Sequence, residues 1–445
     1  MIKAIRWWRL KKVLSLALPS GVNNFLEIFV LAVSIFFMGK LSDSHIVAMG
    51  VGLQYMLLFY ALNSVFYIGT NATLSRLVGA KDMELVSVGY CSILLGACVL
   101  CGLAGVVGFL GVSSFVDWMG LKDEANHLAQ EYLHVLVLAL PAIFIKNVMV
   151  AALASFSDTL TPFLIKLVMS VLCLFLNQAL IFGDFGFVRL GIKGAAWTNV
   201  IVAFVELAML FAITTATKKA LRFHATFDFG FFKRAWRVGW PSGFERLLTL
   251  FSMALISKFV ASYGDEVLAG MQIGLRVESF SYMPGLGFSI ACMVLVGQHL
   301  GANQVQKAQE YVRTTLKMGG LFLGVMGVLL VVFAKPFASV FTHNLAVVEV
   351  AGWYLVAVGI SQVPLACLFV LDGTFRGAGM AKVSLLINTL SLWSLRIIPM
   401  YFLLQHGYHV RWLFVVICLE TYARAGVFYW AYRRGWWKKP GRFAH

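Results

Sequence analysis

Apolar runs of membrane-spanning length recur along this chain and are its strongest constraint. Of its 445 residues, 60% are hydrophobic and only 13% are charged. A soluble domain is about half apolar and about a quarter charged, so this excess requires a non-aqueous environment. Runs of about 20 apolar residues, long enough to cross a bilayer as a helix, recur about a dozen times. We predict an all-α polytopic membrane protein with twelve transmembrane helices, at 13–39, 46–75, 87–113, 128–154, 162–183, 193–216, 236–262, 267–298, 314–335, 347–375, 383–404 and 411–432.

The second half of the chain repeats the first at a constant displacement of 222 residues. The repeated pairs are Pro19-Ser20-Gly21 with Pro241-Ser242-Gly243, Gly52-Leu53 with Gly274-Leu275, Gly79-Ala80 with Gly301-Ala302, and Tyr132-Leu133 with Tyr354-Leu355. Parallel repeats that hold substrate between them are typical of secondary transporters. We therefore predict two pseudo-symmetric six-helix bundles, at residues 1–216 and 236–445, joined by a cytoplasmic linker at 217–235.

The formal net charge of +16 follows from an uneven distribution of basic residues between the two membrane faces. The face that carries both termini holds clusters at 3–12, 218–237 and 433–442, and shorter connections that include Lys166 and Arg376. The opposite face carries only Lys40, Lys122, Arg189, Lys193, Lys335 and Arg411. The positive-inside rule then places both termini in the cytoplasm. The basic charge thus indicates topology and contact with anionic membrane lipids, and we expect no nucleic-acid partner.

Several classes of site have no motif in this chain. There is no GxxxxGK[ST] loop, so we expect transport energy to come from an ion gradient rather than from a nucleotide. The histidines form no HExxH or paired-ligand pattern, and we therefore expect no metal site, no cofactor and no enzymatic activity. A selective channel is an alternative, but it would need a filter loop or a ring of charges. The sequence contains neither.

A further motif lies in the predicted eighth span. It runs from Gly274-Leu275-Arg276-Val277-Glu278-Ser279-Phe280, through Met283-Pro284-Gly285-Leu286-Gly287-Phe288, to Gly297-Gln298-His299-Leu300-Gly301-Ala302. This segment resembles the signature of the multidrug and toxic compound extrusion (MATE) family, as do Leu180-Ile181-Phe182-Gly183 and Gly373-Thr374-Phe375-Arg376-Gly377-Ala378-Gly379. The resemblance covers essentially the whole chain. It implies an antiporter, coupled to protons or sodium ions, that expels amphipathic and often cationic organic compounds.

Two positions depart from the family pattern. The family places an acidic residue five positions before the glycine that ends the first span, and here Gly39 gives Ser34. A second family acid lies six positions before the glycine of Ile-Phe-Gly, and here Gly183 gives Asn177. Both usual carboxylates of the N-terminal half are absent, so coupling is expected to depend more on the C-terminal half.

The first span still offers a carboxylate of its own. Glu27 lies two helical turns before Ser34, so the two side chains project from nearly one face. A carboxylate within a span costs about 2.5–3.5 kcal/mol on insertion scales, and such groups usually face a cavity. We predict that Glu27 takes part in ion coupling; the alternative is a solvated residue at the membrane boundary.

Glu245 is the corresponding candidate in the C-terminal half. With Thr249 and Ser252 it forms one polar face of the predicted seventh span, and the repeat pairs it with Asn23. A buried glutamate suits a group that loads and releases a proton, whereas a structural ion pair is the competing interpretation.

Three further charged residues are candidates for the ion or substrate site. Arg276 and Glu278 lie two residues apart within the eighth span and cannot face each other, so Arg276 with Glu245 is one candidate pair. Asp372, in the tenth span, either faces the cavity or meets cytoplasmic water or Arg376.

A proline interrupts the eighth span. Pro284 cannot join the hydrogen-bond ladder of a helix, and it is followed by Gly285 and Gly287. Bent helices near a central site are common in transporters, so this segment predicts a kink and a candidate hinge.

Other charged residues within the spans are interpreted as snorkelling to the membrane surface. They are Lys146, Glu206, Lys258, Arg396, Glu420 and Arg424.

The expected protein is thus a monomeric, multi-pass transporter of a bacterial cytoplasmic membrane that exchanges drug-like compounds for H⁺ or Na⁺. A flippase for lipid-linked saccharides, from the same superfamily, is the alternative. It would predict fourteen spans and a more basic cavity.

Overall fold

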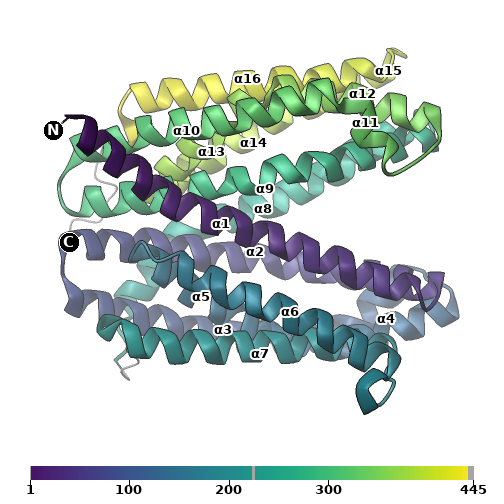
Figure 1. The fold of residues 1–445 in the computed structure, drawn as a ribbon, viewed down its shortest axis with the longest axis horizontal. Coiled ribbons are helices and arrows are strands. Elements are labelled where there is room, and N and C mark those ends of the chain that lie inside the picture. The colour runs from purple at the N-terminus through teal and green to yellow at the C-terminus, as the bar shows by residue number, and fades with distance from the viewer. Residues whose placement is uncertain (1, 223–225, 439–445) are drawn as a thin grey trace. The chain divides into compact units, whose positions relative to one another are not determined.

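The computed structural model describes residues 2–222 and 226–438, and all regular secondary structure within them is helical (Figure 1). Lys439 and Arg442 of the predicted C-terminal basic cluster, and residues 223–225 of the predicted linker, lie outside the described residues. The α-helices are α1 (Ile2–Gly39), α2 (Asp43–Ala80), α3 (Met83–Trp118), α4 (Asp123–Leu136), α5 (Leu140–Ser155), α6 (Leu160–Phe182), α7 (Ile192–Thr217), α8 (Phe229–Ala261), α9 (Asp265–Gly301), α10 (Val305–Val332), α11 (Ala334–Ser339), α12 (Leu345–Ile360), α13 (Gln362–Gly377), α14 (Ala381–Ser391), α15 (Ile398–Gln405) and α16 (Arg411–Arg433).

Among the described residues, ten helical segments are long and apolar enough to cross a membrane. An eleventh span is formed by α12 and α13 together, which are bent by 55° at their junction. The sequence predicts one span there, at 347–375. The bend falls at Ser361, three residues before Pro364, because a proline cannot continue the hydrogen-bond ladder of the preceding turn.

The one remaining predicted span, the seventh at 236–262, corresponds to α8. This helix is continuous from Phe229 to Ala261, but it is not among the segments that are apolar enough by composition. Glu245, Arg246 and Lys258 interrupt its apolar stretches. Charged residues inside a spanning helix are expensive in lipid and usually have a polar surrounding, so α8 is where a functional site is expected.

The chain divides into two compact units. One comprises Met1–Val22 with Phe244–His445, and the other comprises Asn23–Gly243; we call them the C-terminal and N-terminal units. Both boundaries fall inside helices, α1 and α8, at the repeated Pro-Ser-Gly segments. The division therefore differs from the predicted bundles at both edges, because each unit includes the first part of the other half's leading helix.

The repeat has a physical cause in each unit. In the N-terminal unit, Gly52 of α2 faces the ring of Tyr132 of α4, and a Cβ atom on Gly52 would lie 2.6 Å from ring carbons. In the C-terminal unit, Gly274 of α9 faces the ring of Tyr354 of α12 with equally little room. Glycine at the crossing lets each aromatic ring pack against a helix backbone, so both residues of the pair recur at the same displacement.

Candidate functional site

Glu245 lies at the centre of a polar cluster inside the C-terminal unit. Its carboxylate accepts two hydrogen bonds from Nη2 of Arg376, at 3.0 and 3.2 Å, and one from Nδ2 of Asn388, at 2.9 Å. The Glu245 side chain is 13% exposed and that of Arg376 is 14% exposed. Glu245 comes from α8, Arg376 from α13 and Asn388 from α14, so three helices hold this group.

Asp372 joins the same cluster. Its Oδ2 atom lies 2.6 Å from Nε of Arg376, one turn along α13, and Asn388 donates to its Oδ1 at 3.5 Å. Two carboxylates therefore share one guanidinium and one amide. Arg376 pairs with both acids, so these three charged side chains carry one more acid than base. Hard cations such as Na⁺ bind oxygen ligands, and protons bind carboxylates, so this cluster is suited to both.

Glu278 is held separately within the same unit. The Tyr354 hydroxyl donates to Oε2 of Glu278 at 2.6 Å. Gly274, one turn earlier on α9, makes room for the Tyr354 ring and so brings its hydroxyl to the carboxylate. The repeat places Met56 at the equivalent position of the N-terminal half. The scaffold is repeated in both halves, but this acid is present in one only.

A third group in the C-terminal unit is an arginine–glutamate–arginine cluster. Glu420 of α16 has a side chain that is 0% exposed, and its Oε2 accepts from Nη2 of Arg396 at 2.5 Å. Nε of Arg424 lies 3.0 Å from Oε1 of the same carboxylate. Arg396 reaches it from the π-helical turn η4 (Leu392–Ile397). The snorkelling interpretation is wrong for these three residues, because they pair with one another inside the unit.

The three groups act on one another electrostatically. Arg424 interacts with Glu245, and Arg396 interacts with Glu278. The three groups contain four carboxylates and three guanidiniums. The carboxylates belong to Glu245, Glu278, Asp372 and Glu420, and the guanidiniums to Arg376, Arg396 and Arg424. These three groups together therefore hold one more acidic than basic side chain.

The N-terminal unit holds a balanced set of charges. Nζ of Lys146 lies 2.7 Å from Oε2 of Glu206, and Nζ of Lys166 lies 4.0 Å from the same atom. Lys166 also pairs with Oε1 of Glu27 at 3.5 Å. Two lysines thus face two glutamates. Lys146 and Glu206 are buried together rather than snorkelling, whereas the Glu27 side chain is 47% exposed.

Ser34 and Asn177, the two positions where the family pattern has acids, meet in this unit. Nδ2 of Asn177 donates to Oγ of Ser34 at 3.3 Å, and the Ser34 hydroxyl donates to the carbonyl of Val30. Both side chains are buried, and the Asn177 Oδ1 atom has no hydrogen-bond partner among the described residues. Glu27 lies on the same helix but is exposed, so it does not share their environment.

The remaining predicted site residues lie apart from these clusters. Arg276 is exposed on α9, and Glu245 pairs with Arg376 rather than with Arg276. α9 continues through Pro284 as one helix, and a hinge there stays a prediction. Lys258 is exposed near the end of α8, where a long side chain reaches the membrane surface.

The distribution of charge along the sequence misplaces two basic residues that pair with buried or membrane-embedded acids. It counts Lys166 and Arg376 with the cytoplasmic connections, yet they lie within α6 and α13 and pair with acids inside their units. The spacing of Asp372 and Arg376, four residues apart, is the signal that could have placed them on one helical face. Asn388 carries no such signal, because only the packing of α14 brings it to Glu245.

The MatE family model matches the chain twice, over residues 19–178 and 241–402. The two matches begin at Pro19 and Pro241, the prolines that open the repeat.

Relatives of known sequence agree with this match. A Thermotoga maritima protein named "Probable multidrug resistance protein NorM" is 27% identical over 399 residues, which cover 87% of this chain and 84% of the relative. A Bacillus subtilis protein named "Probable multidrug resistance protein YoeA" is 24% identical over a region that covers 76% of this chain and 74% of the relative.

Solved structures show the same fold. A crystal structure of MATE in complex with MaL6 and one of a mutant of the Vibrio cholerae MATE transporter VcmN each have a TM-score of 0.90 at 20% identity. A Pyrococcus furiosus MOP superfamily transporter, described as having a binding pocket of reverse polarity, has a TM-score of 0.87 at 20% identity. Each comparison covers 97% of both chains. The predicted all-α, membrane-spanning fold class is confirmed, and the chain belongs to the MatE family of multi-pass membrane transporters.

Proposed function

We propose that this chain is a secondary active antiporter that exports amphipathic, often cationic organic compounds in exchange for H⁺ or Na⁺. The relatives that carry the multidrug-resistance names support the substrate class. The observation that carries the coupling assignment is the pair of acids, Glu245 and Asp372, that shares the single guanidinium of Arg376.

The coupling step follows from the cost of a buried negative charge. An ionised carboxylate without a cation costs several kcal/mol when water is removed from it. A proton or Na⁺ that binds between Glu245 and Asp372 cancels this charge. The protein with the ion bound then favours a conformation in which the cluster is shielded from water, and the protein without the ion favours one in which it is hydrated. An ion gradient can therefore drive the change from one conformation to the other.

The N-terminal unit is assigned a smaller part in coupling. Glu27 and Glu206 already have lysine partners, and Ser34 and Asn177 replace the family's acids. No carboxylate of this described set needs an added cation for neutrality. We therefore assign the coupling ion to the C-terminal unit.

The proposed site of action is a bacterial cytoplasmic membrane, with both termini in the cytoplasm and the protein acting as a monomer. The basic clusters at the termini and in the connection after α7 support this orientation.

The decisive experiment measures ethidium transport into everted membrane vesicles. A proton gradient and a sodium gradient are imposed in turn, and we expect one of them to drive accumulation. If neither gradient drives ethidium or a second, uncharged amphipathic dye, the antiport proposal is wrong.

Variants of the two glutamates test the assignment of the coupling ion. Glu245→Gln keeps the side-chain shape but removes the negative charge, and we expect driven transport to fall to the background of vesicles without the protein. Glu27→Gln should retain most of the activity, and Glu349→Gln, at an exposed position, serves as the matched control. Normal transport by Glu245→Gln would contradict the proposed site.

A further inference from the structure

A groove on the C-terminal unit has one basic end and one apolar end. It has a volume of about 710 Å³ and lies among the end of α10, the short helix α11, α12 and α16. Lys335, Trp353 and Arg411 line one end of it. Ile360, Val415 and Leu419 line the remainder, and they are 53%, 37% and 62% exposed.

The length of the groove matches one membrane leaflet. Leu419 lies eight residues after Arg411 on α16, and Ile360 lies eight residues after Gly352 on α12. At about 1.5 Å per residue, each helix carries the groove about 12 Å from its basic end. Half of a bilayer's hydrocarbon core is about 15 Å thick. The apolar part is therefore long enough for most of one acyl chain within a leaflet.

The two basic residues lie against adjacent residues of α12, Gly352 and Trp353. The stem of Lys335 lies along α12 at Gly352, where an added Cβ atom would be 3.4 Å from the Lys335 Cγ. Arg411 lies over the ring of Trp353, 3.9 Å from its centroid, and its side chain is 57% exposed. Glu349 lies 3.5 Å from Arg411 and balances one of the two positive charges. The rim stays net positive, and a guanidinium has donors left for a second partner.

The position of these residues is unusual for the sequence. Basic residues are scarce on the face opposite the termini. In the C-terminal half they are Lys335 and Arg411, with Lys258 in the last turn of α8. Both Lys335 and Arg411 line the same groove. Membrane orientation disfavours basic residues on that face, so two of them in one groove indicate a local role.

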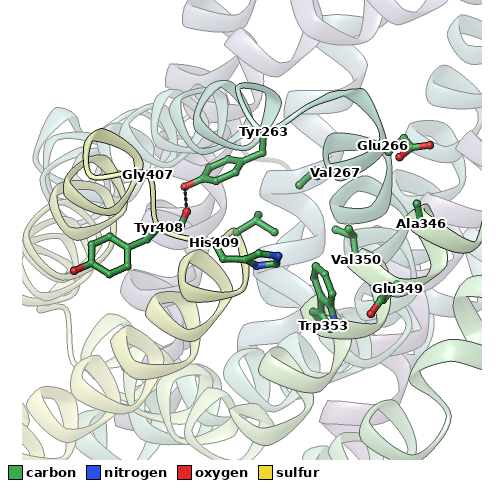
Figure 2. A pocket seen from close by; sticks show the side chains of 11 residues that line it. Tyr263, Glu266, Val267, Ala346, Glu349, Val350, Trp353, Gly407, Tyr408 and His409 are labelled. Atoms are coloured by element: carbon green, nitrogen blue, oxygen red, sulfur yellow. Dashed lines mark hydrogen bonds between the residues drawn. The ribbon is translucent and has the colours of Figure 1, made fainter.

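A second hollow, which Trp353 also lines, has the opposite character. It has a volume of about 440 Å³, and both Glu266 and Glu349 line it, with Glu349 beside Trp353 (Figure 2). The Tyr263 hydroxyl donates to the carbonyl of Tyr408 at 2.8 Å and joins two connections across it. An anion is therefore disfavoured in this hollow and favoured in the groove that Lys335 lines.

We propose that the groove binds an anionic phospholipid, with its phosphate between Lys335 and Arg411 and one acyl chain along α12 and α16. This site rests on the membrane orientation proposed above, but it does not depend on transport activity. Trp353 at the junction suits the boundary between headgroups and hydrocarbon.

The test uses the full-length protein in nanodiscs of equal phosphatidylglycerol and phosphatidylcholine. Native mass spectrometry counts the lipids retained, and a phosphatidylglycerol with a photoreactive acyl chain maps the contact by peptide sequencing. We expect preferential retention of phosphatidylglycerol and cross-links in residues 353–360 of α12 and 411–419 of α16. Equal retention of both lipids, or cross-links spread over unrelated helices, would overturn the proposal.

Four variants sharpen this test. Lys335→Ala and Arg411→Ala should each weaken phosphatidylglycerol binding about fivefold, the typical contribution of one basic residue near an anionic headgroup. Lys122→Ala, on the same face but in the N-terminal unit, is the matched control and should have no effect. Glu349→Gln should strengthen binding, since it frees Arg411 from its partner.

A variant that fills the groove distinguishes lipid binding in the groove from general attraction between basic residues and anionic lipid. Cys418→Trp fills the apolar part without a change in charge, and bound phosphatidylglycerol should be lost. Retention by Cys418→Trp would contradict the site, as would a dimer in which a second copy protects the groove from cross-linking. Ethidium transport is measured in parallel, so loss of lipid binding and loss of transport are recorded independently.

Discussion

The buried cluster of Arg396, Glu420 and Arg424 contributes to stability mainly through charge balance. Glu420 is enclosed by Arg396 and Arg424 and has no exposed side-chain surface. Taking such charges out of water carries a penalty that mutual attraction only partly offsets. The cluster therefore adds little net stability over apolar residues, but its parts depend on one another. Removing one partner leaves the others as buried, unbalanced charges.

We predict that Glu420→Gln destabilises the protein by about 3–5 kcal/mol, because two buried arginines lose the carboxylate that they share in this cluster. Thermal unfolding in detergent measures the change. Glu349→Gln removes an exposed partner of Arg411 and should shift stability by about 0–1 kcal/mol.

Joint replacement of the three residues checks the reason for that loss. Arg396→Met, Glu420→Leu and Arg424→Met together should recover most of the stability, since no unpaired charge remains within the cluster itself. If the triple variant is as unstable as Glu420→Gln, the cluster has a structural role beyond charge balance.

At the scale of elements, glycines set how closely helices cross. Gly21 of α1 packs against Pro284 of α9 inside the C-terminal unit, and a Cβ atom on Gly21 would lie 2.8 Å from the Pro284 carbonyl oxygen. Its repeat partner Gly243 faces Ala61 of α2 in the N-terminal unit, where the corresponding distance to the Ala61 oxygen is also 2.8 Å. At Gly21 all three nearest atoms are backbone atoms of Pro284, which cannot turn aside as a flexible side chain can, whereas at Gly243 the Val65 side chain lies nearer still, at 2.4 Å.

We predict that Gly21→Val lowers stability by at least about 1–3 kcal/mol, the usual penalty for overpacking. Yield of monodisperse protein and thermal unfolding in detergent are the measurements. Gly320→Ala is the matched control, since no atom lies within 4 Å of its added Cβ. It should be neutral or slightly stabilising. Wild-type stability for Gly21→Val would mean that α1 and α9 separate easily.

At the scale of the whole molecule, the two halves exchange their leading segments. Met1–Val22 belongs to the C-terminal unit, and the first part of α8, up to Gly243, belongs to the N-terminal unit. Each unit is therefore completed by a segment that the other half encodes. In each unit, the surface that packs against this borrowed segment is covered only when both halves of the chain are present.

We predict that residues 1–222 and 223–445, expressed as separate chains, are each degraded alone but accumulate when expressed together. Immunoblots of membrane fractions measure their abundance. Co-expression of 1–222 with 244–445, which lacks the first part of α8, should leave the N-terminal fragment unprotected. Stable accumulation of 1–222 alone would contradict this dependence.

We also predict the orientation of the whole molecule from its basic clusters. Alkaline phosphatase, which is active only outside the cytoplasm, should be active when fused after Gly407 and inactive when fused after His445. The reverse pattern would contradict the proposed topology and would move the Lys335 groove to the cytoplasmic leaflet.

Part of the site could be predicted from the chain alone. Glu245, Glu278 and Asp372 were identifiable because an acid inside an apolar run is costly and needs a partner. The family pattern also singles out Ser34 and Asn177, and the structure places their Oγ and Nδ2 atoms 3.3 Å apart. The residues that pair with these acids could not be predicted in the same way. Asn388 and Glu245 are 143 residues apart in the chain, and no local pattern connects them.

The linear chain alone accounts for the all-helical fold, the twofold repeat and the family, because apolar periodicity, span length and a constant displacement can all be measured along it. Which charges meet is a property of the folded molecule. The charge pattern counts Arg376 with the loops, yet α13 presents it to two acids, and Glu420 is the centre of an ion cluster. Pairing depends on which helices pack together and how they are rotated, and neither property is encoded in any single apolar run.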